Sequence, residues 1–320
     1  MSSRTLDSSP SILPLYARAA APMIPGASLL PFVPGGGGEI PDLDLRLEGV
    51  ETDPAAVAAY AKVCGFGLRD HLPPTYPHVL AFPLQMAVMA DGGFPFGAVG
   101  LVHVENRIEQ HRRVGIDEQL AIRVRPTKLQ PHPKGRTFSL LTEATVDGDL
   151  AWQSTSTMLR RGSSSSNSAP KDDKAELHRI SDPPGREFDA VPAEAPASAE
   201  WRLDGGLGRS YAAVSGDRNP IHMHSLTAKP LGFPSAIAHG MWTKARCLAA
   251  LDSRLPDSFV VDVRFRKPIL LPARVEFASA AEGDEITFAV RDAKRQIPHL
   301  DGHVAPLESK PKATTGRKSK

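Results

Sequence analysis

The sequence has little cysteine and no long apolar run. Only two of its 320 residues, Cys64 and Cys247, are cysteines, which argues against a disulfide framework and fits a reducing compartment. No stretch approaches the roughly 20 apolar residues that span a bilayer. The proline-interrupted N-terminus also lacks the apolar core of a secretory signal. These absences predict a cytoplasmic protein without a membrane span.

A strong excess of one charge is also missing, because the net charge is only +2. Five cations lie in residues 309–320, and subtracting them from +2 leaves −3 for the rest of the chain. A segment this polar cannot bury enough apolar surface to fold alone. We therefore interpret residues 306–320 as a disordered basic tail and expect no nucleic-acid partner.

Composition divides the rest of the chain into four segments. Residues 1–40 are predicted to form a loose arm with little core of its own. Residues 163–199 are rich in Ser, Pro and Ala, as is typical of a linker. Two stretches with regular apolar patterns remain, 41–162 and 200–305, and each has the length of one domain.

These two stretches have the pattern of a repeat. The segment YAKVCGFGLRDH, residues 60–71, aligns with YAAVSGDRNPIH, residues 211–222, at an offset of 151. Tyr, Val, Gly and His recur at equivalent positions, and each segment continues an amphipathic helix with apolar residues such as Ala56 at i, i+4 and i+7. Thr52 or Asp53 is placed to cap the first of these helices.

The two halves continue with the same predicted elements. A buried helix is expected over 82–91 and again over 239–251. Strands with period-two alternation follow in each half, separated by the turn sequences DGD and EGDE, which favour hairpins. The fold class is therefore α+β, with an antiparallel sheet wrapped around a central helix in each half.

The halves differ in the chemistry of the aligned turn. Asp217 and Asn219 of the second half are replaced by Phe66 and Leu68 in the first. The first half is thus expected to bind rather than react. We predict that these two apolar residues and the segment 73–89, with its methionines, line an apolar cavity for a flexible ligand.

Asp217 and His222 are the candidates for proton transfer. They are five residues apart with Pro220 between them, so a bent loop can bring both side chains to one water. Asp and Asn also suit a purely structural turn, and Ser215 is expected to bond the backbone there. The HMH sequence at 222–224 leaves a zinc site as a further alternative.

The segment 211–241 resembles the signature of the MaoC-like (R)-specific enoyl-thioester hydratases and 3-hydroxyacyl-thioester dehydratases. The resemblance rests on SGDRNPIH at 215–222 and IAHGM at 237–241, and RFRKPILLP at 264–272 is similar to the strand that follows in the family. The two-half layout extends the resemblance to double hot-dog members. It implies two hot-dog repeats in one chain, of which the first has lost its catalytic motif.

The resemblance implies a hydro-lyase that interconverts trans-2-enoyl and (3R)-3-hydroxyacyl thioesters of coenzyme A or acyl carrier protein, without a cofactor or metal. It implies catalytic roles for Asp217 and His222. Asn219 is expected to hold the loop or contact substrate, and His239 to be a hydrogen-bonded structural histidine. Gly240 opens the second buried helix, where its N–H can face an oxyanion.

Other functions remain open on the residues alone. A hot-dog thioesterase could use similar polar groups to direct water at the thioester carbonyl. A non-catalytic acyl-binding or scaffold protein is the alternative outside the enzymes, although it needs neither Asp217 nor His222. A homodimer is the candidate assembly.

Overall fold

The computed structural model describes residues 2–21, 38–161, 191 and 197–307. Most of the expected linker and basic tail, and part of the N-terminal arm, therefore lie outside the described residues. Among the helices of the described ranges, none combines the length and apolar character needed to cross a membrane.

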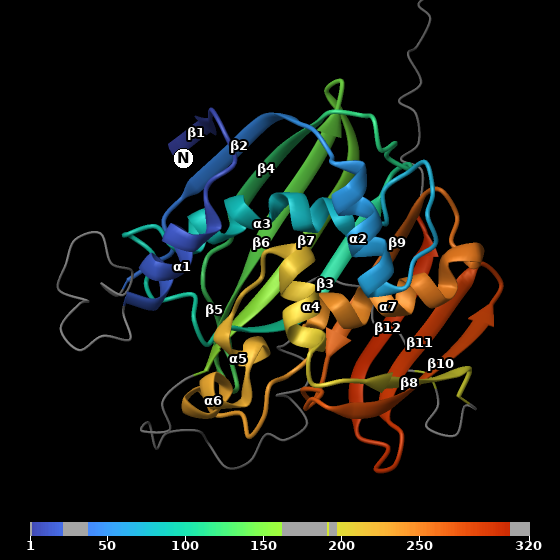
Figure 1. Cartoon of the computed structure of the whole chain (residues 1–320). Helices are drawn as coiled ribbons and strands as arrows, with labels where there is room; N and C mark the ends of the chain where they lie inside the picture. The colour runs from blue at the N-terminus through green and yellow to red at the C-terminus, as the bar shows by residue number, and fades with distance from the viewer. Residues whose placement is uncertain (1, 22–37, 162–190, 192–196, 308–320) are drawn as a thin grey trace, which may run out of the picture.

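One twelve-stranded sheet runs through the described chain (Figure 1), in the order β1-β2-β4-β6-β7-β3-β9-β12-β11-β10-β8, with β5 beside β6. The strands that precede the linker are β1 (Ser2–Leu6), β2 (Leu43–Val50), β3 (Val102–Gln110), β4 (Leu120–Pro126), β5 (Gln130–His132), β6 (Gly135–Val146) and β7 (Asp149–Arg161). Those from the second half are β8 (Ala199–Leu203), β9 (Phe259–Phe265), β10 (Ala273–Glu282), β11 (Glu285–Asp292) and β12 (Pro298–Pro306).

Counted outward from the centre of the sheet, β3, β7, β6, β4 and β2 correspond to β9, β12, β11, β10 and β8, whereas β1 and β5 have no counterpart in the second half. At the centre, β3 pairs with β9 in antiparallel fashion, with Asn106 opposite Val263. The predicted hairpins are confirmed: β6 turns into β7 through Asp147 and Gly148, both at positive φ, and β10 turns into β11 through Gly283. These turns match the right-handed twist of the strands they join.

Helices cover one face of this sheet (Figure 1). The two predicted buried helices are α3 (Tyr76–Met89) and α7 (Gly240–Leu251), and both are mostly buried. Beside them lie α2 (Pro54–Cys64) and α4 (Leu207–Ser215), which contact each other. Each half thus places one central helix against its own set of antiparallel strands.

The repeat is visible where α2 and α4 meet. The aligned residues Tyr60 and Tyr211 have ring centroids 6.1 Å apart, and the aligned glycines Gly65 and Gly216 both end their helices in the left-handed conformation. Only glycine adopts that conformation without strain. Asp53 caps α2 by accepting from Ala55 N–H, as predicted.

The predicted inward face of α2 is partly wrong. Ala56 is exposed, and the buried residues are Val57, Tyr60, Ala61 and Cys64. The helix packs against α4 and α7, so its inward stripe is rotated from the one that the sequence alignment selected.

The prediction of a loose arm is wrong for the described part of the N-terminus. β1 (Ser2–Leu6) pairs in parallel with β2, and α1 (Ile12–Ala20) packs against α3. The reason is an apolar stripe with helical spacing: Ile12, Leu15 and Tyr16 pack against the main core, and Ala19 is fully buried.

Candidate active site

The loop after α4 is shaped by local hydrogen bonds. The Ser215 hydroxyl accepts from Asp217 N–H at 3.2 Å, which is the backbone-bonding role that the sequence predicts. The side chain of Asn219 accepts from Ile221 N–H at 3.5 Å and caps the short helix α5 (Pro220–Met223). The loop therefore turns sharply and presents Asp217 and the α5 residues to the same side.

Each oxygen of the Asp217 carboxylate has a different environment. Oδ1 accepts from the Tyr16 hydroxyl at 2.8 Å and from Asn219 N–H at 3.1 Å, whereas Oδ2 lies 3.8 Å from His239 Nε2. Burial raises the pKa of this carboxyl, but His239, His222 and the two donors outweigh it, so the pKa lies below its ordinary value. Asp217 is ionised at neutral pH.

His222 is buried on α5, and one of its ring nitrogens is engaged in a hydrogen bond. Its Nδ1 lies 2.8 Å from the carbonyl oxygen of Ile237, an acceptor, so Nδ1 carries the proton and donates it. Burial lowers the pKa of His222 below its ordinary value, against the opposing field of Asp217. The ring is therefore neutral, and its Nε2 is left as a hydrogen-bond acceptor.

His239 completes a compact polar group. It is the residue before α7, its ring stacks on His222 with 3.7 Å between ring centroids, and its Nε2 donates to the Asp217 carbonyl at 3.0 Å. Burial lowers its pKa to about 3. Its hydrogen bond agrees with the structural role that the sequence predicts. The sequence did not predict that His239 contacts Asp217.

Gly240 is the first residue of α7, where a helix leaves its N–H groups without partners in the helix. A side chain at this position would be crowded, because an added Cβ would lie 3.0 Å from the ring of Phe265, which would have to move to admit it. The packing of a strand residue over the helix start therefore favours glycine at this position.

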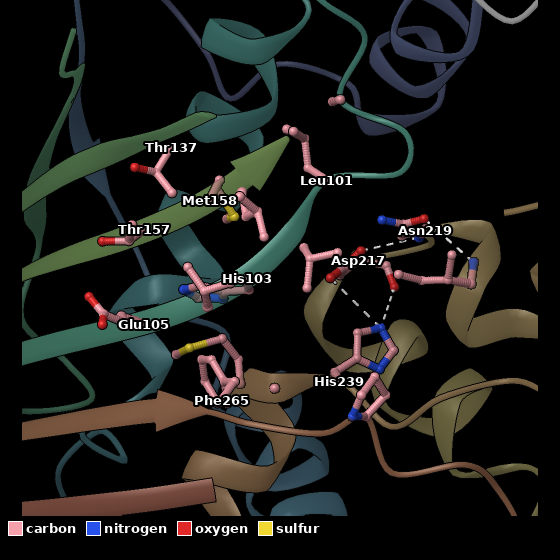
Figure 2. Close-up of a pocket in the computed structure, with 18 of the residues that line it drawn as sticks. Leu101, His103, Glu105, Thr137, Thr157, Met158, Asp217, Asn219, His239 and Phe265 are labelled. Atoms are coloured by element: carbon pink, nitrogen blue, oxygen red, sulfur yellow. Dashed lines mark hydrogen bonds and ion pairs between the residues drawn. The ribbon is translucent and has the colours of Figure 1, made fainter. Parts of the chain in front are cut away.

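A single cavity of about 1460 Å³ contains this group and extends into the first half. Figure 2 shows Asp217, Asn219 and His239 on one side, with His103 and Phe265 from β3 and β9 on the other. The first half contributes apolar side chains, among them Phe82, Met86, Met89, Leu101, Phe138 and Met158, and also polar ones such as His103, Glu105 and Thr137. The Asp217 group thus shares one cavity with apolar side chains of the first half.

The predicted cavity of the first half is only partly correct. Met86 and Met89 line the cavity, as expected of the segment 73–89. Phe66 and Leu68 do not: Phe66 packs in the core, and Leu68 is 76% exposed. The aligned turn of the first half lies at the surface. Phe66 and Leu68 therefore replace Asp217 and Asn219 in the sequence but do not line the cavity.

Three residues of this group could also hold a metal ion. One ligand atom each from Asp217, His222 and His239 lie within 4.8 Å of one another. The zinc alternative suggested by the HMH sequence shares His222 with this group but not His224, which is exposed and whose Nδ1 accepts from Leu226 N–H at the start of the next short helix.

Comparison with known proteins places this site in a family. Residues 194–302 match the family described as MaoC like domain. The chain is 38% identical over 301 residues to 3-hydroxyacyl-thioester dehydratase X of Mycobacterium tuberculosis, covering 93% of this chain and 99% of the relative. The chain belongs to the MaoC-like dehydratase family.

Solved structures identify the fold of this family member. The crystal structure of HtdX from Mycobacterium tuberculosis has a TM-score of 0.70 at 34% identity, covering 82% of this chain and 100% of that one. A conserved hypothetical protein from the same organism, described as a double hot-dog fold, has a TM-score of 0.50 at 15% identity over 84% and 96% of the two chains. The fold is thus two hot-dog repeats, as the sequence predicts.

Proposed function

We propose that this MaoC-like protein is a hydro-lyase that hydrates trans-2-enoyl thioesters to (3R)-3-hydroxyacyl thioesters and catalyses the reverse dehydration. The observation that carries the proposal is the pairing of two acceptors, ionised Asp217 and neutral His222, in a cavity that continues among apolar side chains. The (R) configuration of the product and the thioester group of the substrate are expected from the resemblance of residues 215–222 and 237–241 to the family signature.

The two acceptors suit the activation of one water molecule. A water that donates one O–H to Asp217 Oδ2 and the other to His222 Nε2 is held with its oxygen free to add to Cβ of the enoyl group. As the C–O bond forms, His222 takes the proton, and the electrons of the double bond move to Cα and the thioester oxygen. The imidazolium, stabilised by ionised Asp217, then returns a proton to Cα. Atoms and charge balance, and both acceptors end unprotonated.

The developing charge on the thioester oxygen requires a donor. Gly240 N–H is suited to this, because it stands at the start of the twelve-residue helix α7 and lines the same cavity. The helix dipole favours negative charge at that end. We assign Asn219 the support of Asp217, since its backbone N–H donates to the carboxylate and its side chain caps α5.

The experiment that tests the function uses a short and a long trans-2-enoyl-CoA. The expected result is loss of the conjugated enoyl absorbance without release of free thiol, and an unchanged rate after treatment with a chelator. Release of thiol would instead identify a thioesterase. Loss of activity in chelator that zinc restores would assign Asp217, His222 and His239 to a catalytic metal.

The partners and the compartment belong to the same proposal. The substrate is carried by coenzyme A or acyl carrier protein, and the candidate assembly is a homodimer. The cytoplasm is the proposed compartment, and both cysteines, Cys64 and Cys247, are buried and free as a reducing environment permits.

A further inference from the structure

The N-terminal helix α1 lies directly against the loop that carries Asp217. Ile12 packs so closely on this loop that a Cβ added at Gly216 would meet its Cδ1 at 2.6 Å. One helical turn later, the Tyr16 side chain reaches into the cavity. The residue after Asp217 is held as well, because Arg218 N–H donates to the Tyr16 hydroxyl at 2.7 Å.

The Tyr16 hydroxyl therefore links the backbone and the carboxylate of the same loop. It accepts one hydrogen bond from Arg218 and donates one to Asp217 Oδ1 at 2.8 Å. Oδ1 also accepts from Asn219 N–H, so this oxygen is occupied by two donors from the protein. Oδ2 is the carboxylate oxygen that remains for a water in the cavity.

Building on the proposed function, we infer that Tyr16 is a positioning residue for the hydration reaction, supplied to the site by the N-terminal arm. It fixes the rotamer of Asp217 so that Oδ2 faces the water, and its hydrogen bond favours the ionised carboxylate. A hydrogen bond to an ionised acceptor is stronger than one between neutral groups. A small error in the position of an acceptor lowers the rate by roughly tenfold to a hundredfold.

Tyr16 acts through Asp217 and not as an acid. Burial, followed by the charge of Asp217, raises the pKa of Tyr16 well above its ordinary value, so the hydroxyl stays protonated throughout the working range. Its proton is directed at Oδ1, and its oxygen accepts from Arg218 N–H. With its proton donated to Asp217, the Tyr16 hydroxyl holds the carboxylate in place and does not donate a proton to the substrate.

The effect on pH dependence follows from the groups around Asp217. The titratable side chains that act on it from neighbouring elements are Tyr16 of α1, His78 of α3, His103 of β3, Tyr211 of α4, His222 of α5 and His239 before α7. Arg218 is its neighbour in the chain. Of these, Tyr16 is the side chain that donates a hydrogen bond to the carboxylate. Removing that donor raises the pKa of Asp217 and shifts the acidic limb of activity to higher pH.

The experiment compares Tyr16→Phe with wild type and with Tyr60→Phe in the full-length protein. Phe keeps the ring contacts and removes only the hydroxyl. Tyr60 is a matched control, because its buried hydroxyl donates to Thr75 at 2.8 Å, away from the carboxylate. The pH profile of kcat/KM is measured with a trans-2-enoyl-CoA. The pKa of Asp217 is measured directly by NMR in protein labelled with 13C at the Asp carboxyl carbons. The Asp217 signal is identified as the one that is missing in Asp217→Asn.

The expected result for Tyr16→Phe is a fall in kcat of roughly tenfold, with little change in KM. Its acidic limb and its Asp217 titration both shift to higher pH. Tyr60→Phe lowers the melting temperature but leaves both titrations in place. Acidic limb and carboxyl titration equal to those of wild type would overturn the inference, even if Tyr16→Phe were slower. If the wild-type protein hydrates no enoyl thioester, the proposed function is wrong. The carboxyl titration would then still test whether the Tyr16 hydroxyl lowers the pKa of Asp217.

Discussion

At the scale of single residues, the site depends on two side chains that both act as acceptors. We predict that Asp217→Asn and His222→Ala each lower kcat for hydration by roughly a hundredfold or more, because either change removes one of the two groups that hold and activate the water. The matched control is His224→Ala, which removes an exposed imidazole two residues from His222 and should keep most activity. Near-wild-type turnover in a folded Asp217 or His222 variant would contradict these assignments.

The protonation states of the same residues predict the pH profile. Hydration needs Asp217 ionised and His222 neutral. The neighbours of Asp217 lower its pKa against the effect of burial, whereas burial lowers the pKa of His222 against the charge of Asp217. Activity is lost only as pH falls through these lowered values, so kcat/KM should stay level from pH 8 through 6.5, the ordinary value of imidazole. The lowered pKa values also destabilise the fold in acid, so the melting temperature is followed in parallel. Half-loss of activity at or above pH 6.5 without unfolding would disprove this.

The sequence indicated part of this site and missed the rest for a physical reason. Asp217, Asn219 and His222 are close in the chain, so the loop that gathers them is encoded locally by turn formers and a proline. Tyr16 lies 201 residues before Asp217, and no periodicity or spacing connects the two. Its position depends on how α1 packs on the finished fold. The sequence pattern alone gave no signal for that contact.

At the scale of elements, α3 is the helix through which the first half contributes to the cavity. Met86 and Met89 lie on its cavity side, whereas Val88 is fully buried and does not line the cavity. The apolar run 82–91 predicted a buried helix, and the structure confirms it and extends the helix back to Tyr76, because a helix that is buried on all sides is apolar on all sides. It could not tell which side of that helix faces an empty space, since packing and lining residues have the same chemistry.

We therefore predict that Met86→Trp raises KM for long-chain enoyl thioesters by roughly tenfold and spares short ones, because the larger side chain shortens the space for the acyl tail. Val88→Trp is the control on the same helix: overpacking lowers its melting temperature, with equal effects on both substrates. The measurement is KM for a short and a long trans-2-enoyl-CoA in each folded variant. Equal changes for both substrates in Met86→Trp would show that this residue only fills the core.

At the scale of the whole molecule, the two repeats are joined by the β3–β9 pair and by a buried lysine. Lys244 of α7 is fully buried, and its Nζ lies 2.6 Å from the Asn106 side-chain oxygen, 3.1 Å from the Asn106 carbonyl and 3.1 Å from the Val261 carbonyl. One side chain thus contacts both central strands. The repeat in the sequence predicted two similar halves, but not a junction of this kind, because Lys usually lies on a solvated face.

This junction predicts how stability depends on pH. Burial lowers the pKa of Lys244 well below its ordinary value of 10.5, so the folded chain binds fewer protons there than the unfolded chain. Stability then rises with pH between the folded and unfolded pKa values, by up to about 1.4 kcal/mol per pH unit. We expect the free energy of unfolding of wild type to increase relative to Lys244→Met between pH 7 and 10, measured by urea denaturation.

Lys62→Met is the control for this comparison, because it makes the same substitution at a lysine that is exposed on α2. Both repeats should unfold in one transition in wild type, since the sheet is continuous across β3 and β9. A constant difference between wild type and Lys244→Met over this range would mean that the buried ammonium keeps its proton at all these pH values. In that case its three acceptors, and not burial, would control its charge.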